Sequence, residues 1–147
     1  MNVVPKKYVP LLIIVLLIVG YEWFINARTE RYQAMAYLSE GLAISAPVKI
    51  QVATYYQMQG EFPDSNAEAD LPMPEAFNGQ SLVSVGVSDG GIVTLTFDEK
   101  SGVSGGIIEF IPIIDFAKGV TWECFSPSYH SVPACRYVIA QSVGAEQ

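Results

Sequence analysis

The chain has 147 residues, half of them hydrophobic, and a formal net charge of -7 at pH 7. This length holds one modest domain besides the apolar N-terminal stretch, and the acidic charge excludes the clustered Lys and Arg side chains that nucleic-acid binding requires. The single histidine leaves few residues for general-base or metal chemistry, so we expect no enzyme, no metal site and no cofactor.

The N-terminal stretch is apolar over residues 9–25, interrupted only by Gly20 and Glu22. As a helix it would span about 25 Å, slightly less than the roughly 30 Å hydrocarbon core of a bilayer. Tyr8 and Trp23 lie near its ends, where aromatic rings prefer the membrane interface. The pattern therefore predicts a transmembrane helix in contact with the lipid bilayer.

Two lysines, Lys6 and Lys7, precede the apolar run. The positive-inside rule then keeps the N-terminus in the cytoplasm and exports the remainder of the chain. A cleaved secretory signal has the same charged start and apolar middle, but the residues FINA that end at Ala27 are a poor match to a small-residue cleavage site. A retained anchor is the preferred interpretation, and a cleaved signal is the alternative.

An anchor of this kind can also pack against other transmembrane helices. Positions at three- and four-residue intervals share one side of a helix, and Gly20 offers a point of close approach. The predicted packing positions are Leu12, Val15, Leu16, Val19, Gly20 and Trp23.

The helical pattern continues from the anchor into residues 26–59 without a strong helix breaker. Pro47 should bend this helix, and Gly60 and Pro63 should end it. Charged and polar side chains mark the predicted solvent side, at Arg28, Glu30, Arg31, Glu40, Lys49 and Gln57. The predicted face toward the domain core consists of apolar or small residues three to five positions apart, namely Tyr32, Met35, Leu38, Leu42, Ala46, Ile50, Ala53 and Met58.

Residues 60–81 are rich in Pro, Gly and acidic residues and have no periodicity, which predicts a loop of unusual length. Acidic or amide side chains alternate along it, at Asp64, Asn66, Glu68 and Asp70. An EF-hand calcium loop has this alternation, but it needs Gly at its sixth position and Glu at its twelfth. Here these positions hold Ala69 and Glu75. A solvated acidic loop is preferred, with calcium binding by residues 64–75 as the alternative.

The pattern changes to alternation at residue 82, which indicates β-strands. The turn sequence SDGG at 88–91 joins the first two strands into a hairpin, and Pro112 indicates an edge or a bulge in the third. A fifth strand or a pinned tail follows at 135–139. The four clear strands cover residues 82–87, 92–97, 107–114 and 120–124. The predicted fold class is α+β, a long N-terminal helix, transmembrane and then amphipathic, packed on a four-stranded antiparallel sheet.

Two cysteines, Cys124 and Cys135, are close together near the C-terminus. An even number of cysteines in an exported domain predicts a disulfide, and two unpaired buried thiols are the alternative. A zinc site would need more ligands than these residues and His130 supply. The sequence contains no nucleophile–base pair and no phosphate-binding glycine loop.

The order of these segments resembles the type IV pilin family over nearly the whole chain. The segment AYLSEGL (36–42) is similar to the part of pilins just after the membrane helix, and VATYYQMQGEFP (52–63) to the helix end and the start of the αβ loop. GVTWEC (119–124) followed by VPACR (132–136) is similar to the last strand and the disulfide-closed loop. The resemblance implies a pilin fold and a structural, non-catalytic protein.

The N-terminal part departs from the pilin pattern. Prepilins carry a Gly just before the processed N-terminus, where the leader peptidase cuts, and a Glu at the fifth position of the mature chain, which pairs with a neighbouring subunit's N-terminal amine. Counted back from the Ser39–Glu40 pair, these positions fall at Pro5 and Pro10, and the first mature residue falls at Lys6. This departure predicts an unprocessed chain without the usual assembly glutamate.

The preferred hypothesis is a single-pass, pilin-like protein of the bacterial inner membrane. Residues 1–8 would lie in the cytoplasm, residues 9–25 would span the membrane, and residues 26–147 would form a periplasmic domain. The N-terminal helix would pack against other membrane helices, as part of an accessory subunit of a membrane complex. The alternative is a divergent type IV pilus subunit, major or minor, that polymerises into an extracellular filament. A third hypothesis is an envelope domain that binds calcium or another ligand through the acidic loop.

Overall fold

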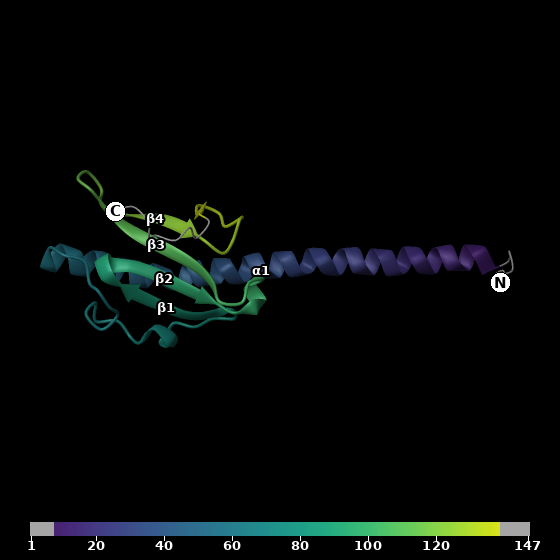
Figure 1. The fold of residues 1–147 in the computed structure, drawn as a ribbon, viewed down its shortest axis with the longest axis horizontal. Helices are drawn as coiled ribbons and strands as arrows, with labels where there is room; N and C mark the ends of the chain where they lie inside the picture. The colour runs from purple at the N-terminus through teal and green to yellow at the C-terminus, as the bar shows by residue number, and fades with distance from the viewer. Residues whose placement is uncertain (1–7, 139–147) are drawn as a thin grey trace, which may run out of the picture. The chain divides into compact units, whose positions relative to one another are not determined.

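The computed structural model describes residues 8–138 of the chain. The chain forms two compact units, Met1–Gln33 and Ala34–Gln147, and α1 belongs to both. The elements, labelled in Figure 1 where there is room, are α1 (Val9–Gln59), η2 (Pro74–Ala76), β1 (Leu82–Ser88), η3 (Asp89–Gly91), β2 (Ile92–Phe97), η4 (Glu99–Ser101), β3 (Gly106–Asp115), β4 (Gly119–Ser126) and β5 (Arg136–Tyr137).

The second unit is built from the C-terminal half of α1 packed on one face of a β-sheet (Figure 1). The buried positions of the helix recur every three or four residues, so they form one face, and they are Leu38, Gly41, Ser45, Val48 and Val52. The sheet contributes alternate residues to the same core, among them Val85, Leu95, Phe97 and Ile108. Alternation along each strand therefore buries one side of the sheet against α1.

The predicted core face of this helix is wrong at half of its positions. Intervals of three to five residues drift around a helix that repeats every 3.6 residues. The predicted face also omits the small residues Gly41 and Ser45, which are buried. Met35, Leu42 and Ala53 are partly buried and Leu38 is fully buried. The exposed positions are Tyr32, Ala46, Ile50 and Met58.

Pro47 lies inside α1, and the helix continues through it to Gln59. The next residue, Gly60, has a φ of 82° and donates its backbone N–H to the carbonyl oxygen of Tyr56 at 2.8 Å. A glycine in this left-handed conformation is a common helix terminator because it closes the last turn without a Cβ clash. The helix therefore ends where the glycine allows the chain to turn.

The five strands form one sheet in the order β1-β2-β3-β4-β5. The first four strands are antiparallel to their neighbours, but β5 pairs with β4 in parallel, with Phe125 opposite Arg136. The predicted four-stranded antiparallel sheet is therefore corrected to a mixed sheet of five strands. The loop after β4 carries the chain back so that it runs beside β4 in the same direction. Residue 139, the end of the predicted fifth strand, lies outside the described residues.

Strand β3 is longer than β2, and its last part pairs only with β4. The last residue of β3 paired with β2 is Phe110, opposite Val93, whereas the pairs with β4 continue to Asp115. Pro112 lies in this extension, opposite Trp122. Proline cannot donate a backbone hydrogen bond, so it is accommodated where β3 has one paired neighbour instead of two.

Candidate assembly surfaces

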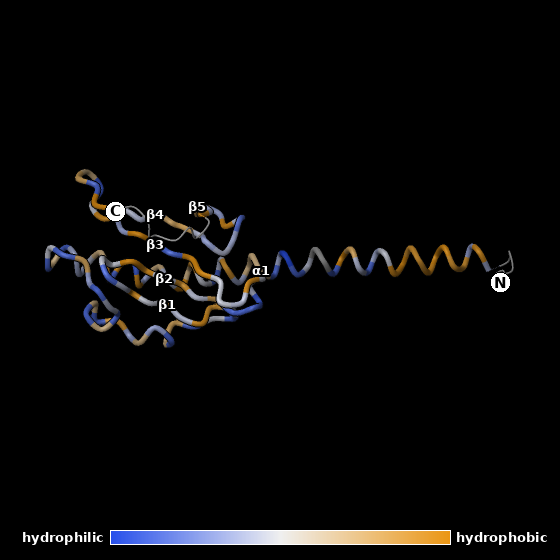
Figure 2. Tube along the Cα trace, in the orientation of Figure 1, coloured by the Kyte–Doolittle hydropathy of each residue, from blue (hydrophilic) through white to orange (hydrophobic). Residues whose placement is uncertain are grey.

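The first half of α1 is an apolar segment, coloured orange at the N-terminal end of the chain in Figure 2. Its large hydrophobic side chains, from Val9 to Ile25, are between 40% and 77% exposed. By length and composition, α1 is the one helix in the described part of the chain that could cross a membrane. Apolar side chains exposed in this number need a lipid or protein surface around them.

The predicted helix-packing positions all lie on this segment with their side chains exposed. Leu12, Leu16 and Trp23 are 45%, 68% and 77% exposed, and Val15 and Val19 are similarly open. A Cβ atom added at Gly20 would have no neighbouring atom within 4 Å, which leaves room for close approach of another helix. Contact between these six positions and a partner helix stays a prediction.

The second half of α1 has an outward face that is small and uncharged, and sequence reasoning missed it. Exposed helices of soluble domains usually carry charged side chains on this face. Here the hydroxyl of Ser39 donates a hydrogen bond to the carbonyl oxygen of Met35 at 2.8 Å, and that of Thr54 to Ile50 at 2.9 Å, so neither offers its proton outward. The exposed residues of this outward face are Ala36, Ser39, Ala43, Ala46, Pro47 and Ile50. Most of these residues are spaced three or four positions apart and none is charged, and this pattern is the sequence signal that indicates the face.

The predicted solvent-side residues Glu40 and Lys49 bind the chain's own sheet and loop. The Glu40 carboxylate accepts a hydrogen bond from the backbone N–H of Gln80 at 3.2 Å. The Nζ atom of Lys49 lies 3.9 Å from the centre of the Phe110 ring, and partial burial there lowers the pKa of the lysine. Both charged side chains therefore make contacts within the domain. They do not place a charge on the outward face of α1.

The loop of residues 60–81 is held to α1 and to the β1–β2 turn by its own acidic side chains. Glu68 accepts hydrogen bonds from the Tyr55 hydroxyl at 3.0 Å and from the backbone N–H of Asp64 at 2.7 Å. The bond to Glu68 is the main reason why the pKa of Tyr55 is raised. Asp64 in turn accepts a bond from the backbone N–H of Gly90 at 3.1 Å. These carboxylates therefore hold the loop in shape by accepting hydrogen bonds from backbone N–H groups and from a tyrosine hydroxyl.

Asn66 is the buried centre of this loop. Its side-chain N–H groups donate to the carbonyl oxygens of Pro72 at 2.9 Å and Val85 at 3.1 Å, and its oxygen accepts from the backbone N–H of Val87 at 2.6 Å. The alternating residues therefore do not converge on a common point. Within residues 8–138, no group of three or more His, Cys, Asp or Glu side chains is arranged to hold a metal ion, and the calcium alternative gains no support.

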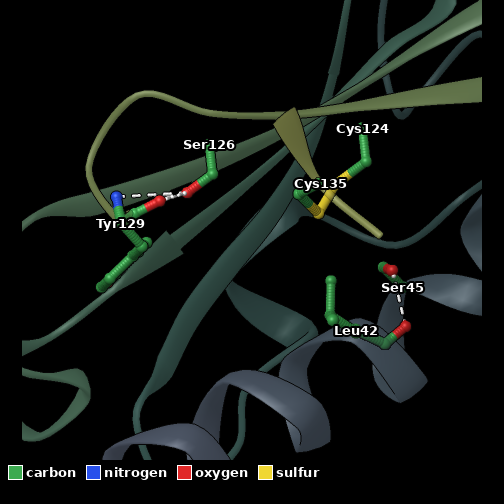
Figure 3. Close-up of a disulfide and its surroundings, with 6 residues drawn as sticks. All are labelled: Leu42, Ser45, Cys124, Ser126, Tyr129 and Cys135. Atoms are coloured by element: carbon green, nitrogen blue, oxygen red, sulfur yellow. Dashed lines mark hydrogen bonds between the residues drawn. A yellow bond between two sulfur atoms is a disulfide. The ribbon is translucent and has the colours of Figure 1, made fainter. Parts of the chain in front are cut away.

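The predicted disulfide between Cys124 and Cys135 is confirmed, with its two Cα atoms 4.5 Å apart. Both residues pack against the core cluster. In Figure 3 the disulfide lies on the side of the sheet that faces α1, above Leu42 and Ser45. It fixes the start of β5 to β4 and so holds the C-terminal loop against the sheet.

The loop closed by the disulfide is anchored in the core by Tyr129. Its hydroxyl lies 2.6 Å from the buried Ser101 hydroxyl, and its ring packs edge-on against Phe97 with centroids 6.1 Å apart. Burial raises the pKa of Tyr129. Ser126 closes the turn, because its hydroxyl donates to the carbonyl oxygen of Tyr129 and accepts from the backbone N–H of the same residue (Figure 3). The loop is thus part of the folded framework.

Comparison with known proteins agrees with this architecture. Residues 34–138, well over half of the chain, match the family model for pilin, the protein of a bacterial filament. No individual curated protein matches the chain. The matched region covers the second half of α1, the long loop, the five strands and the disulfide. The chain therefore belongs to the type IV pilin family, a family of structural subunits, with its long apolar N-terminal helix compatible with a single-pass membrane anchor.

Proposed function

We propose that this pilin is a structural subunit that packs α1 against helices of other membrane proteins, as an accessory subunit of a membrane complex. One observation carries the proposal: α1 has an apolar first half and an uncharged outward face, Ala36 to Ile50, along its second half. In a bilayer, helices associate by close packing of small and apolar side chains, since lipid chains are as apolar as leucine. The apolar first half is suited to contacts with other helices within the membrane, and the outward face of the second half is suited to contacts beyond it.

The proposal includes retention of the N-terminal segment. The positions of the prepilin Gly, the first mature residue and the assembly Glu are occupied by Pro5, Lys6 and Pro10; the first two lie outside the described residues. A carboxylate within the bilayer is costly unless a partner amine neutralises it. A chain without that glutamate needs no such pairing, so its association depends on helix packing alone.

The proposed location is the bacterial inner membrane, with the N-terminus in the cytoplasm and residues 26–147 in the periplasm. Lys6 and Lys7 precede the apolar run and favour this orientation. The disulfide between Cys124 and Cys135 is consistent with an oxidising compartment.

A filament subunit is the second candidate, and the outward face of α1 favours it. Ala36, Ala43 and Ile50 lie well beyond the apolar segment of residues 9–25, so lipid does not account for their lack of charge. In a filament, each such face would pack against the helices of neighbouring copies. Processing of the N-terminus separates this candidate from the accessory subunit.

Photo-crosslinking in the full-length chain tests the role of α1. Benzoylphenylalanine at position 43 of the outward face should crosslink to a helix of another membrane protein or of a second copy. The same residue at position 67, an exposed alanine in the long loop, is the matched control and should not. Ala43→Glu places a charge in the packed surface and should remove the complex while leaving the domain folded. Equal crosslinking at both positions, or a complex that survives Ala43→Glu, would contradict the proposal.

A further inference from the structure

The hairpin between β3 and β4 exposes large apolar side chains at its tip. Figure 1 shows this hairpin projecting clear of the other strands. Phe116 is completely exposed, and Ile113 and Ile114 are 39% and 47% exposed. An aromatic ring held in solvent gains nothing for the fold of its own chain, whereas aromatic residues at interfaces often contribute much of the binding energy.

The tip is held in a defined shape. The carboxylate of Asp115 accepts hydrogen bonds from the backbone N–H groups of Ala117 at 2.8 Å and Lys118 at 3.1 Å. Gly119 has a φ of 81°, a conformation that glycine adopts without strain, and it pairs with Asp115 to close the hairpin. Because the turn is ordered by these contacts, Phe116 is presented outward before any partner binds, which lowers the entropic cost of association.

The tip also carries a free positive charge. In residues 34–138, where acidic residues far outnumber basic ones, Lys100 pairs with Asp98 and Arg136 with Glu123. Lys49 lies over the Phe110 ring. Lys118 is exposed and, among the described basic side chains of this unit, is the one without an ion pair or ring contact. The surface that fits the tip is therefore apolar and acidic.

The chain itself carries such a surface on its long loop. Met73 is 74% exposed and extended, with φ and ψ of -54° and 148°. Asp70 and Glu75 lie on either side of it in sequence, both exposed and neither in an ion pair within the described residues. An exposed thioether between carboxylates complements an exposed aromatic ring beside an ammonium group.

We propose that the hairpin tip of one copy (Ile113, Ile114, Phe116 and Lys118) docks on the Met73 segment (residues 70–75) of a second copy. The two surfaces are different patches of one unit, so a contact made in one direction is heterologous and can repeat from copy to copy. It lies in the second unit and is independent of the helix packing proposed above. The acidic surroundings disfavour an anionic lipid surface as the occupant.

Crosslinking from the tip tests this contact in the full-length chain in detergent micelles. Benzoylphenylalanine replaces Phe116, and after irradiation the attachment site is mapped by mass spectrometry. The expected product is a covalent dimer joined at residues 70–75. Position 103, an exposed valine in the turn at the other end of β3, is the matched control and should give no dimer. Attachment to lipid or detergent, attachment elsewhere on a second copy, or no dimer would each overturn the proposal.

A charge exchange gives an independent readout. Lys118→Glu should lower the dimer yield about threefold, as expected for loss of an exposed ion pair. Glu75→Lys should do the same, and the double variant should restore the yield, because each contact again joins opposite charges. Both residues are exposed, so the single variants should fold like the parent. A double variant no better than the single variants would contradict the assigned contact.

Discussion

Gly41 of α1 lies so close to the Phe97 ring of β2 that a Cβ atom on the glycine would be 2.5 Å from Cε1 of the ring. Phe97 is fully buried, so its ring has little room to move away. This contact sets how closely the helix approaches the sheet, and it explains a glycine within a helix, where glycine is otherwise unfavourable.

Gly41→Ala should therefore destabilise the domain, by about 1–3 kcal/mol, because overpacking outweighs the better helix propensity of alanine. Urea unfolding followed by tryptophan fluorescence measures this change. Gly20→Ala is the control, since no atom lies within 4 Å of the added methyl, and it should not weaken the domain. A Gly41→Ala variant as stable as the parent would mean that the helix and the sheet separate easily.

Asn66→Ala should loosen the long loop. The substitution leaves the N–H of Val87 and the carbonyl oxygens of Pro72 and Val85 without their partner, and each unsatisfied buried group costs about 1–3 kcal/mol. We expect a lower free energy of unfolding and faster protease cleavage within residues 60–81. Asn78→Ala removes one exposed bond and should change neither. Equal effects of the two variants would argue against Asn66 as the centre of the loop.

Removal of the disulfide should destabilise the fold by about 3 kcal/mol, the value expected for a loop of this length. The variant Cys124→Ser with Cys135→Ser should unfold at lower denaturant concentration. A reducing agent should shift the parent to the same midpoint and leave the double variant unchanged. A reductant effect on the double variant would point to a cause other than this bond.

Acid should weaken the contact between Asp98 and Ser81. The Ser81 hydroxyl donates to the Asp98 carboxylate at 2.6 Å and is the main reason why the pKa of Asp98 lies below its ordinary value of 3.8. A lowered folded-state pKa stabilises the fold above the unfolded value, and this contribution disappears as the pH falls through the lowered value.

Ser81→Ala should move the pKa of Asp98 back toward 3.8, which NMR titration of the carboxyl group measures. The stability difference between the parent and the variant should be larger near pH 7 than below the folded-state pKa of Asp98. Ser39→Ala, whose hydroxyl bonds only to its own helix, should leave the titration unchanged. An unaltered pKa in Ser81→Ala would show that this hydrogen bond is not its cause.

Much of the fold could be predicted because local chemistry decides it. The alternation over residues 92–97 matches β2 (Ile92–Phe97), since one face of the sheet is buried and the other is not. Gly60 ends α1 by its backbone conformation alone. The direction of β5 could not be predicted. A disulfide shows which two segments lie close together, but it does not show whether the second strand runs parallel or antiparallel to the first.

The candidate assembly surfaces were only partly predictable, because the exposure of a side chain can depend on contacts between distant parts of the sequence. The apolar run over residues 9–25 has a signal of its own, since it needs lipid or protein around it. The outward face of α1 and the exposure of Phe116 depend on which side the sheet covers, and this follows from long-range contacts such as that of Gly41 with Phe97. The apolar pattern predicts Ala46 and Ile50 in the core, but both are exposed, because the same apolar residues suit a core or an interface.

The proposed function requires that this pilin keeps its N-terminal segment and stays in the membrane. Intact mass of the native protein, combined with N-terminal peptide mapping, tests it most directly. We expect a chain that begins at Met1 or Asn2 without N-methylation. A shortened chain with a methylated N-terminus would contradict it and would identify a subunit that enters the filament pathway.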